Sequence, residues 1–470
     1  MAVTIKKRQI FGIIGAVILL LLMFVIPTSE LLPVPARNML CVMLAVIVML
    51  VTEVFPLGIT CLLAVAMMYF FGCVETVPEA LGGFTNQVVF FVVASFGISQ
   101  ALTVVPASTR MLLMLMKKFG KNIRLLLFAI MLVTAVLSSV ISNVAAAAVF
   151  IPIIMKFLQV YENPDDRKRT ARAYMIALPI SSMIGGMMTP AGSSINLLAI
   201  NMLEKNTGET IPFVNWMVMG IPLAVVLLPI AWLICCKVFK PAPLDQSVIE
   251  NYIEGEQKKI PAKMTGKEKY VIIILVIMLV LWIVSSWVPF FNITAVALVG
   301  LALYCLPGKA NILPWKEFAK SVSLEAFFLM GVMISMGGVI VSTGLSGWIS
   351  ATIFPASMNV GTTVFLIFIA AITFLLLIPI PVAPALITML SAPLIGLAMN
   401  SGVSPVLTMA AFGLCACNCY FLPLDTVPLM TYATGSYDMF DMPKASVFIQ
   451  IIMIFLSAIW LTVCGMIFGL

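Results

Sequence analysis

The chain has 470 residues, of which 62% are hydrophobic and only 10% charged, and its mean hydropathy is +1.17. This composition excludes a soluble globular protein and predicts a polytopic membrane protein, since about 20 consecutive apolar residues span the hydrocarbon core of a bilayer. The absence of histidine excludes HExxH zinc sites, Ser-His-Asp triads and histidine proton relays. We expect no enzyme and no organic cofactor, and the lack of a GK[ST] motif argues against an ATP-driven pump.

The net charge of +7 comes mostly from basic residues in short loops, as the positive-inside rule predicts for a membrane protein. We therefore expect no nucleic-acid partner. The ten cysteines are scattered, and in the one cluster, CACNC at 415–419, helical spacing separates Cys417 from Cys415 and Cys419. This spacing favours small packing residues in a membrane helix over a metal site.

Four apolar segments open the chain, near 10–27, 38–54, 57–72 and 86–105. The first belongs to an expected N-terminal helix within 1–36, and it predicts an anchor because Lys6, Lys7 and Arg8 flank it without an obvious cleavage site. Basic residues mark cytoplasmic ends. We therefore expect a cytoplasmic N-terminus and a multi-pass protein of a bacterial-type inner (plasma) membrane.

Two apolar arms, 122–142 and 144–160, meet at Ser142-Asn143. Basic residues flank both outer ends of the pair, with Lys117, Lys118, Lys121 and Arg124 before it and Arg167, Lys168, Arg169 and Arg172 after it. Both ends should therefore be cytoplasmic. This pattern predicts a re-entrant hairpin over about 122–160, whose tip breaks the backbone where it is buried or lines a polar cavity. An interrupted helix follows over about 172–205, broken in MMTPAGSSINLL (187–198).

A polar stretch at 238–269, the only long charged segment, predicts a cytoplasmic linker between two halves, 37–237 and 270–470. In the second half, LIPIPVAPALITML (377–390) contains Pro379, Pro381 and Pro384, which forbid a continuous helix. Its flanks carry no Lys or Arg, so we expect a re-entrant hairpin over about 363–400 that enters from the outside. A second interrupted helix is expected over about 404–437, broken in YFLPLDTVPLMT (420–431).

The two halves share a pattern: Pro152 aligns with Pro393 and Pro190 with Pro423, while the charges that flank the hairpins are opposite. This pattern predicts inverted repeats, with about 11 transmembrane helices plus two re-entrant hairpins in an all-α protein. Matched interruptions of this kind mark the central binding site of a transporter, although a single proline is more often a simple kink.

Polar residues gather at three of the four predicted breaks: Ser138, Ser142, Asn143, Thr189, Ser193, Ser194, Asn196, Asn418 and Thr426. Half-helix N-termini at such breaks attract anions, and the unwound carbonyls and hydroxyls coordinate cations. No Lys or Arg lies at any tip or break. An anion would therefore be held by helix dipoles, hydroxyls and bound cations, which suits carboxylates and sulfate alike.

The residues at these breaks are similar to those of the divalent anion/sodium symporter family, which carries dicarboxylates, tricarboxylates or sulfate. Ser142-Asn143-Val144 resembles the family's hairpin motif, and 189–196 (TPAGSSIN) resembles its broken-helix turn. Outside the breaks, 52–57 (TEVFPL), Gly337-Gly338 and 343–345 (TGL) also resemble family segments. The resemblance implies symport coupled to sodium, or to protons, by a homodimer whose hairpins and broken helices move as an elevator.

By the same resemblance, the substrate would be bound by Ser142, Asn143, Val144, Ser193, Ser194, Pro384, Ala385, Thr426 and Val427. A first sodium-like site would consist of Ser138, Ser142, Asn143 and Gly192, and a second, degenerate site of Asp425, Pro379 and Val382. The second site is degenerate because Ala383-Pro384-Ala385 stands where the family carries another Ser-Asn-Thr motif. Asp425 replaces a typically small residue, either as an ordinary helix cap or as a group that couples transport to a cation or proton.

Three alternatives remain open at this point. The chain could be an uncoupled exchanger or channel for small anions, or a transporter of sulfate or another inorganic anion. A membrane enzyme is the third, and the lack of histidine and of a clustered acid pair argues against it.

Overall fold

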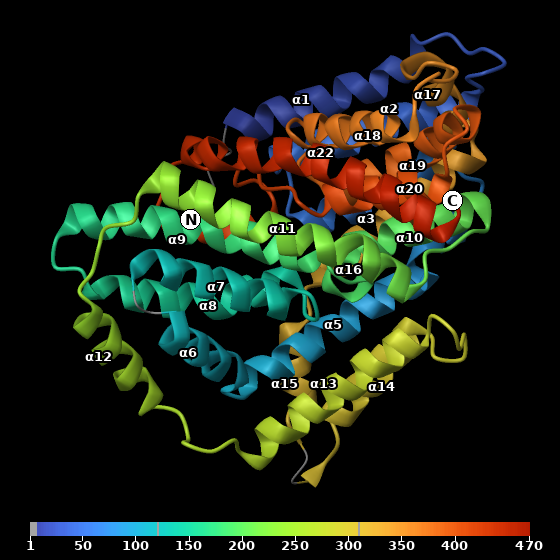
Figure 1. Cartoon of the computed structure of the whole chain (residues 1–470). Coiled ribbons are helices and arrows are strands. Elements are labelled where there is room, and N and C mark those ends of the chain that lie inside the picture. Colours follow the sequence, from blue (N-terminus) through green and yellow to red (C-terminus); the bar gives the residue numbers. More distant parts are fainter. Residues whose placement is uncertain (1–6, 120–121, 309–310) are drawn as a thin grey trace, which may run out of the picture.

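The computed structural model describes residues 7–119, 122–308 and 311–470, and every regular element in these ranges is a helix (Figure 1). The helices of the first half and linker are α1 (Lys7–Leu21), α2 (Val34–Thr52), α3 (Leu57–Phe70), α4 (Val77–Ala80), α5 (Gln87–Val104), α6 (Ala107–Phe119), α7 (Ile123–Ser138), α8 (Asn143–Phe157), α9 (Pro164–Gly186), α10 (Ser194–Thr207), α11 (Phe213–Phe239) and α12 (Gln246–Gln257). Those of the second half are α13 (Gly266–Val284), α14 (Ile293–Tyr304), α15 (Trp315–Ser321), α16 (Leu324–Ser342), α17 (Leu345–Ile353), α18 (Thr362–Leu377), α19 (Ala383–Asn400), α20 (Pro405–Ala416), α21 (Thr426–Tyr432) and α22 (Pro443–Phe468). The predicted all-α class is confirmed. The structure says nothing of the first six residues, which include Lys6 of the expected anchor.

Seven helices in the described ranges are long and apolar enough to cross a membrane: α2, α5, α8 with its extension to Val160, α11, α16, α19 and α22 with its preceding turn. Shorter apolar helices of 10–17 residues accompany them, α3, α7, α14, α18 and α20 among them. A 14-residue helix is only about 21 Å long, less than the roughly 30 Å of the hydrocarbon core. The predicted number of about 11 spans therefore stays a prediction.

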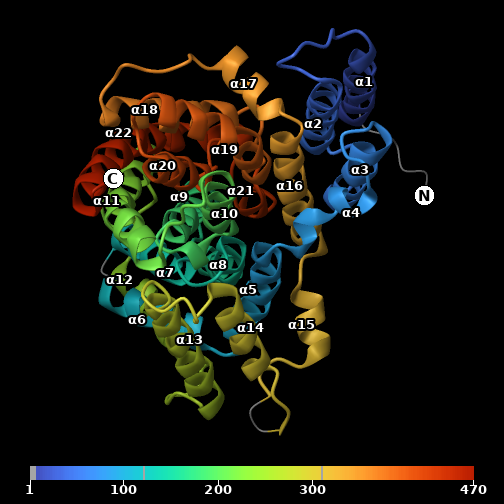
Figure 2. The same ribbon diagram turned by 90° about the vertical axis from the view of Figure 1, so that its right-hand side faces the viewer.

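Most of the helices fall into two groups (Figure 2), with α6, α12 and α17 outside both. The core bundle consists of α7–α11 and α18–α22, in which α7 packs on α9, α11 on α22, and α10 on both α19 and α20. The flanking helices are α1–α5 and α13–α16, in which α5 packs on α14 and α3 on α16. Helices from both halves of the sequence thus lie together within each group. The groups meet mainly where α16 contacts α19 and where α5 contacts α8 and α10.

The core bundle contains two helical pairs, each joined by a tight break. In the first pair, α7 ends at Ser138 and α8 begins at Asn143, with Ser142 as its N-cap. In the second pair, α18 ends at Leu377 and α19 begins at Ala383. Prolines explain the second break, because Pro379 and Pro381 cannot continue α18, whereas Pro384 fits the first turn of a helix, where an N–H is not needed.

Two further breaks interrupt the following helices. α9 ends at Gly186, a short 3-10 turn covers Pro190–Gly192, and α10 begins at Ser194. α20 ends at Ala416, and α21 begins only at Thr426. All four breaks lie within the core bundle, where protein surrounds most of their non-helical backbone, as a membrane protein requires. At the α18–α19 break, Ile378 and Pro379 are exposed.

The polar linker is structured in part. Its helix α12 lies against the end of α8, where the Tyr252 hydroxyl donates to the Ile153 carbonyl at 3.2 Å. Lys156 and Glu256 form an ion pair at 2.7 Å across the same contact. The sequence predicted a polar segment here, but it gave no sign of this helix or of its attachment to the first helical pair.

Candidate functional site

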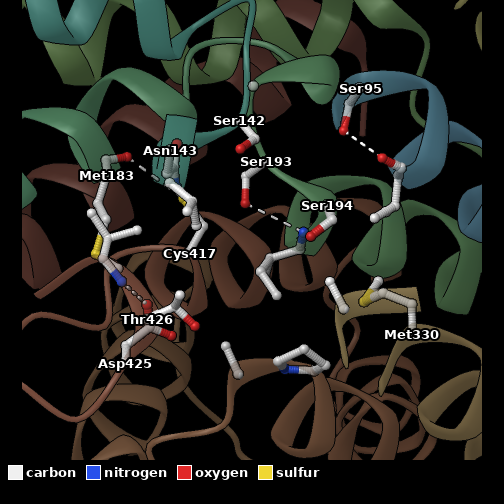
Figure 3. Close-up of a pocket in the computed structure, with 18 of the residues that line it drawn as sticks. Ser95, Ser142, Asn143, Met183, Ser193, Ser194, Met330, Cys417, Asp425 and Thr426 are labelled. Carbon is white, nitrogen blue, oxygen red and sulfur yellow. Dashed lines mark hydrogen bonds between the residues drawn. The ribbon is translucent and has the colours of Figure 1, made fainter. Parts of the chain in front are cut away.

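A cavity of about 170 Å³ lies where the four breaks meet. Figure 3 shows Ser142, Asn143 and Ser193 on one side of it and Asp425 and Thr426 on the opposite side. Its wall is built from the N-terminal turns of α8, α10, α19 and α21, together with one face of α5 and the start of α16. The cavity therefore draws on both halves of the chain and on both groups of helices.

Helix N-termini give the cavity its electrostatic character. Three of the four helices are capped by a side-chain oxygen: Ser142 accepts from the Ala145 N–H, Ser193 from the Ile195 N–H, and Asp425 from the Val427 N–H, each at 3.3 Å. Each helix directs the positive end of its dipole and its first free N–H groups toward this region. None of the described residues that line the cavity is Lys or Arg. The arrangement therefore favours an anion without fixing a positively charged side chain beside it.

Several oxygen atoms converge beside the tip of the first helical pair, the break between α7 and α8. The Ser138 hydroxyl donates to Asn143 Oδ1 at 2.7 Å and lies 3.1 Å from the Ser182 hydroxyl, which donates to the Asn143 carbonyl at 2.8 Å. The same amide end of Asn143 lies 3.2 Å from the Gly192 carbonyl and 3.3 Å from the Ser182 carbonyl. Two arrangements satisfy this cluster: the amide turned so that its nitrogen donates, or a cation bound among the oxygens.

Glycines allow this close approach. A Cβ at Gly186 would lie 2.0 Å from Asn143 Oδ1, and one at Gly192 would lie 2.9 Å from the Ser138 carbonyl. Sodium sites in transporters use unwound carbonyls and hydroxyls of this kind. Three of the four residues predicted for the first sodium-like site, Ser138, Asn143 and Gly192, thus fit the ligand chemistry of a hard cation, with Ser182 as an additional oxygen donor. The fourth, Ser142, uses its hydroxyl to cap α8.

Two predicted polar residues hold the α9–α10 break and do not line the cavity. Asn196 donates to the carbonyls of Gly186 and Thr189, both at 2.8 Å. The Thr189 hydroxyl donates to the Ser139 carbonyl and accepts from the Gly192 N–H. The bond from Thr189 to Ser139 joins the broken helix to the tip of the α7–α8 pair, whereas the Asn196 bonds lie within the broken helix.

Ten of the residues predicted to bind the substrate or a cation line the cavity: Ser142, Asn143, Val144, Gly192, Ser193, Ser194, Pro384, Asp425, Thr426 and Val427. Ser138 lies one layer behind it, in contact with Asn143. Ala385 is 5% exposed and faces α16 beside Met336, away from the cavity.

Two residues predicted for the second cation site are also absent from the cavity wall. The Val382 carbonyl accepts from the N–H groups of Ala385 and Leu386, at 3.0 and 3.2 Å, in the first turn of α19. Pro379 lies outside the wall as well. Of the three residues proposed for that site, only Asp425 lines the cavity, and it is the N-cap of α21.

Several residues of the wall were not predicted: Phe91, Val92, Ser95, Met183, Met330, Cys417 and Cys419. Ser95 lies among apolar residues in the middle of α5 and donates to the Val92 carbonyl of its own helix at 2.8 Å, so its immediate sequence context gives no signal. The CACNC cysteines are all buried, as expected of packing residues. Only Cys415 lies in a helix, however, because α20 ends at Ala416 and the next residues enter the break. Within the described ranges, no group of three His, Cys, Asp or Glu side chains could hold a metal ion.

The chain matches the family model "Sodium:sulfate symporter transmembrane region" over residues 7–470. It is 24% identical over 470 residues to the sodium-dependent dicarboxylate transporter SdcS of Staphylococcus aureus (strain NCTC 8325), covering 94% of this chain and 89% of SdcS. It is 25% identical over 402 residues to a membrane protein of Cupriavidus necator strain H16, covering 82% of this chain and 77% of that protein.

Two solved structures share the fold. MtrF of Neisseria gonorrhoeae matches with a TM-score of 0.56 at 14% identity, covering 97% of this chain and 95% of MtrF. The YdaH transporter of Alcanivorax borkumensis matches with a TM-score of 0.54 at 14% identity, covering 99% of both chains. The family predicted from the breaks is confirmed: this chain belongs to the sodium:sulfate symporter family, as an integral multi-pass membrane transporter and not an enzyme.

Proposed function

We propose that this protein is a secondary active transporter of small divalent anions, with di- or tricarboxylates as the first candidates, coupled to sodium. The observation that carries the proposal is the meeting of four helix N-termini at one cavity whose described wall contains no Lys or Arg. The similarity of this chain to SdcS, a sodium-dependent dicarboxylate transporter, supports carboxylates over sulfate as the substrate.

Charge balance makes cation coupling part of this proposal. A divalent anion would bring two negative charges into a cavity walled largely by apolar side chains, where unpaired charge is costly. Sodium bound among Ser138, Ser142, Asn143 and Gly192 would supply positive charge directly behind the first tip. Ser193, Ser194, Thr426 and Val427 would then hold the anion through hydroxyls and helix N-termini.

A second candidate, exchange without a sodium gradient or symport with protons, is favoured by one observation. The α18–α19 tip presents Ala383 and Pro384 to the cavity, neither of which has a polar side chain. Among the described residues of the wall, Asp425 is the only carboxylate. A sodium site on this side would have few ligands. The coupling stoichiometry, and with it the choice between sodium and protons, thus depends on Asp425.

We further propose an elevator in which the core bundle moves against the flanking helices of a homodimer. The matched helical pairs and broken helices support inverted repeats over 37–237 and 270–470. Pro152 and Pro393 lie inside α8 and α19, the second arms of the two pairs. The bonds from Thr189 to Ser139 and from Ser182 to Asn143 support movement of a tip and its broken helix as one unit.

The proposed function predicts a sodium-dependent thermal shift. Succinate or citrate should raise the melting temperature of purified protein in sodium but not in potassium or choline, since ligand at 100 times its Kd stabilises by about 2.7 kcal/mol. Sulfate in the same three salts is the comparison. A shift with sulfate alone would overturn the carboxylate assignment, and equal shifts in all salts would overturn sodium coupling.

The proposed orientation predicts opposite labelling of the two helical pairs. Lys118, Lys168, Ser357 and Gly402 are all exposed, so single cysteines at these positions should react with a membrane-impermeant reagent. We expect the first two to label only from the cytoplasm and the last two only from outside. Labelling of positions 118 and 168 from opposite sides would show that 123–157 crosses the membrane, and the inverted repeat would be rejected.

A further inference from the structure

Asp425 is the only charged residue in the described wall of the central cavity. It is the N-cap of α21, and Figure 3 shows it on the side opposite Ser142 and Ser193. The residue is half-buried, so part of its surface is open to the cavity. One carboxylate oxygen accepts from the Val427 N–H at 3.3 Å, and a carboxylate has acceptor sites for several more hydrogen bonds. Asp425 can therefore accept a hydrogen bond from a ligand in the cavity.

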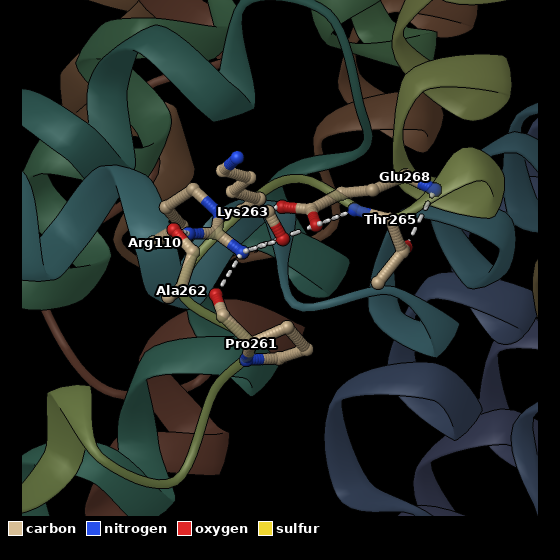
Figure 4. Close-up of polar contacts among 6 residues, drawn as sticks. All are labelled: Arg110, Pro261, Ala262, Lys263, Thr265 and Glu268. Carbon is tan, nitrogen blue, oxygen red and sulfur yellow. Dashed lines mark hydrogen bonds and ion pairs between the residues drawn. The ribbon is translucent and has the colours of Figure 1, made fainter.

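The other largely buried carboxylates of the described chain all have a cationic partner. They are Glu256, Glu268 and Asp441, whose side chains are 18%, 0% and 4% exposed, and each forms an ion pair with Lys or Arg. In the most deeply buried case, Arg110 donates to Glu268 Oε1 at 2.8 Å (Figure 4). Such a partner matters, because an uncompensated buried charge is strongly destabilising. Asp425 forms no ion pair with any described residue, so its counter-charge is left to a ligand or ion in the cavity.

The two sides of the cavity differ in charge. On one side, the neutral hydroxyls of Ser142 and Ser193 cap α8 and α10, so the positive ends of these helix dipoles are not neutralised by a charged side chain. On the other side, the full negative charge of Asp425 exceeds the half charge of a helix N-terminus, and α21 is only seven residues long. The first side therefore favours an anionic group and the second a cationic group.

A metal cation is a poor match for this second side. Hard cations take about six oxygen ligands, whereas Ala383 and Pro384, at the α18–α19 tip, have no polar side chain. The Val382 carbonyl already accepts from two N–H groups within α19. An ammonium group needs no shell of this size, because a single carboxylate forms a strong, charge-assisted hydrogen bond with it. A positive group on the ligand itself is therefore the simplest counter-charge for Asp425.

We propose that Asp425 binds an ammonium group of the substrate, so that the preferred substrate is an amino dicarboxylate such as aspartate. A carboxylate of this substrate lies at the N-termini of α8 and α10, and its ammonium group takes the place of a second cation at Asp425. With succinate, which has no ammonium group, Asp425 would need a coupled cation or proton instead. The inference rests on the proposed function for the transported dicarboxylate and narrows it to one chemical class.

The ammonium group is tested with three four-carbon dicarboxylates. Succinate, malate and aspartate carry a hydrogen, a hydroxyl and an ammonium group, respectively, at the same carbon. Their affinities for purified wild-type protein are measured by thermal-shift titration in sodium. We expect aspartate to bind on the order of tenfold more tightly than succinate, the size of one hydrogen bond between charged groups. Aspartate that binds no more tightly than succinate, or malate that binds as tightly as aspartate, would overturn the assignment.

The role of Asp425 is tested with Asp425→Asn and Asp425→Ser. Asparagine and serine both cap helices, so the variants lose the charge and keep the local fold, which their melting temperatures without ligand check. The preference for aspartate over succinate should fall on the order of tenfold in both variants. Asp438→Asn is the matched control, because Asp438 is an exposed N-cap outside the cavity, and it should keep the wild-type preference. An unchanged preference in both Asp425 variants would overturn the proposal.

The same titrations separate this inference from the proposed function. If succinate raises the melting temperature in sodium and aspartate does not, the ammonium assignment fails while the dicarboxylate transporter stands. If sulfate raises it and none of the three dicarboxylates does, the proposed function fails and the inference fails with it. A preference for aspartate that disappears in Asp425→Asn and Asp425→Ser supports both.

Discussion

Asn143→Ala is expected to abolish uptake and to remove any sodium-dependent stabilisation while the protein still folds. Asn143 joins the oxygen cluster of Ser138, Ser182 and Gly192 to the cavity wall, so its loss affects cation and anion together. Changes to groups that only support a metal ligand commonly cost 10–100-fold in affinity, and a direct ligand should cost at least about a hundredfold. Thermal shifts over a sodium titration, with and without succinate, measure this loss.

If Asn143 had only a structural role, Asn143→Ala would leave transport and the response to sodium intact. Ser142, and not Asn143, is the N-cap of α8, so the alanine variant keeps the cap. Asn122→Ala is the matched control, because Asn122 caps α7 from an exposed position at 2.8 Å. That variant should lose about 1 kcal/mol of stability and retain its response to sodium. Transport at the wild-type level in Asn143→Ala would remove this residue from the site.

Local chemistry made the breaks predictable from the sequence. Prolines and small polar residues act on their own turn of backbone, so α19 begins at Ala383, inside the proline-rich stretch that predicted it. The same holds for the break after Gly186, where the Thr189-Pro190 pair sets the 3-10 turn. The two predicted hairpins have opposite flanking charges, which indicated an inverted repeat and therefore which breaks would meet.

The remaining part of the site depends on packing between distant segments. Ser95 enters the cavity because α5 packs against α8 and α10, and nothing in its own span distinguishes it from other helical serines. Neighbouring residues on a helix also point about 100° apart, so Pro384 lines the cavity while Ala385 faces α16. A motif alignment assigns a substrate-binding role to both residues, whereas the helix directs only one of them toward the cavity.

Asp425→Asn is expected to reduce accumulation of the anion to equilibrium while exchange of anion for anion survives. The structure shows that Asp425 caps α21 through the Val427 N–H, and asparagine caps a helix about as well as aspartate. The substitution therefore removes charge and keeps the local fold. Because Ala383 and Pro384 offer no side-chain ligand, Asp425 is the ionisable group in the described wall that could bind a second cation or carry a proton.

Accumulation in proteoliposomes, measured against sodium and pH gradients imposed separately, distinguishes the two coupling ions. Loss of the sodium-driven component in Asp425→Asn would assign Asp425 to a second sodium site, and loss of the pH-driven component would assign it to proton transfer. Asp438→Asn is the matched control, since Asp438 is an exposed N-cap outside the cavity, and it should leave both components unchanged. If Asp425→Asn accumulates substrate with the wild-type dependence on both gradients, the carboxylate is only a helix cap. The cation among Ser138, Asn143 and Gly192 would then be the one left to drive accumulation, and the charge of a divalent anion would be only partly balanced in the cavity.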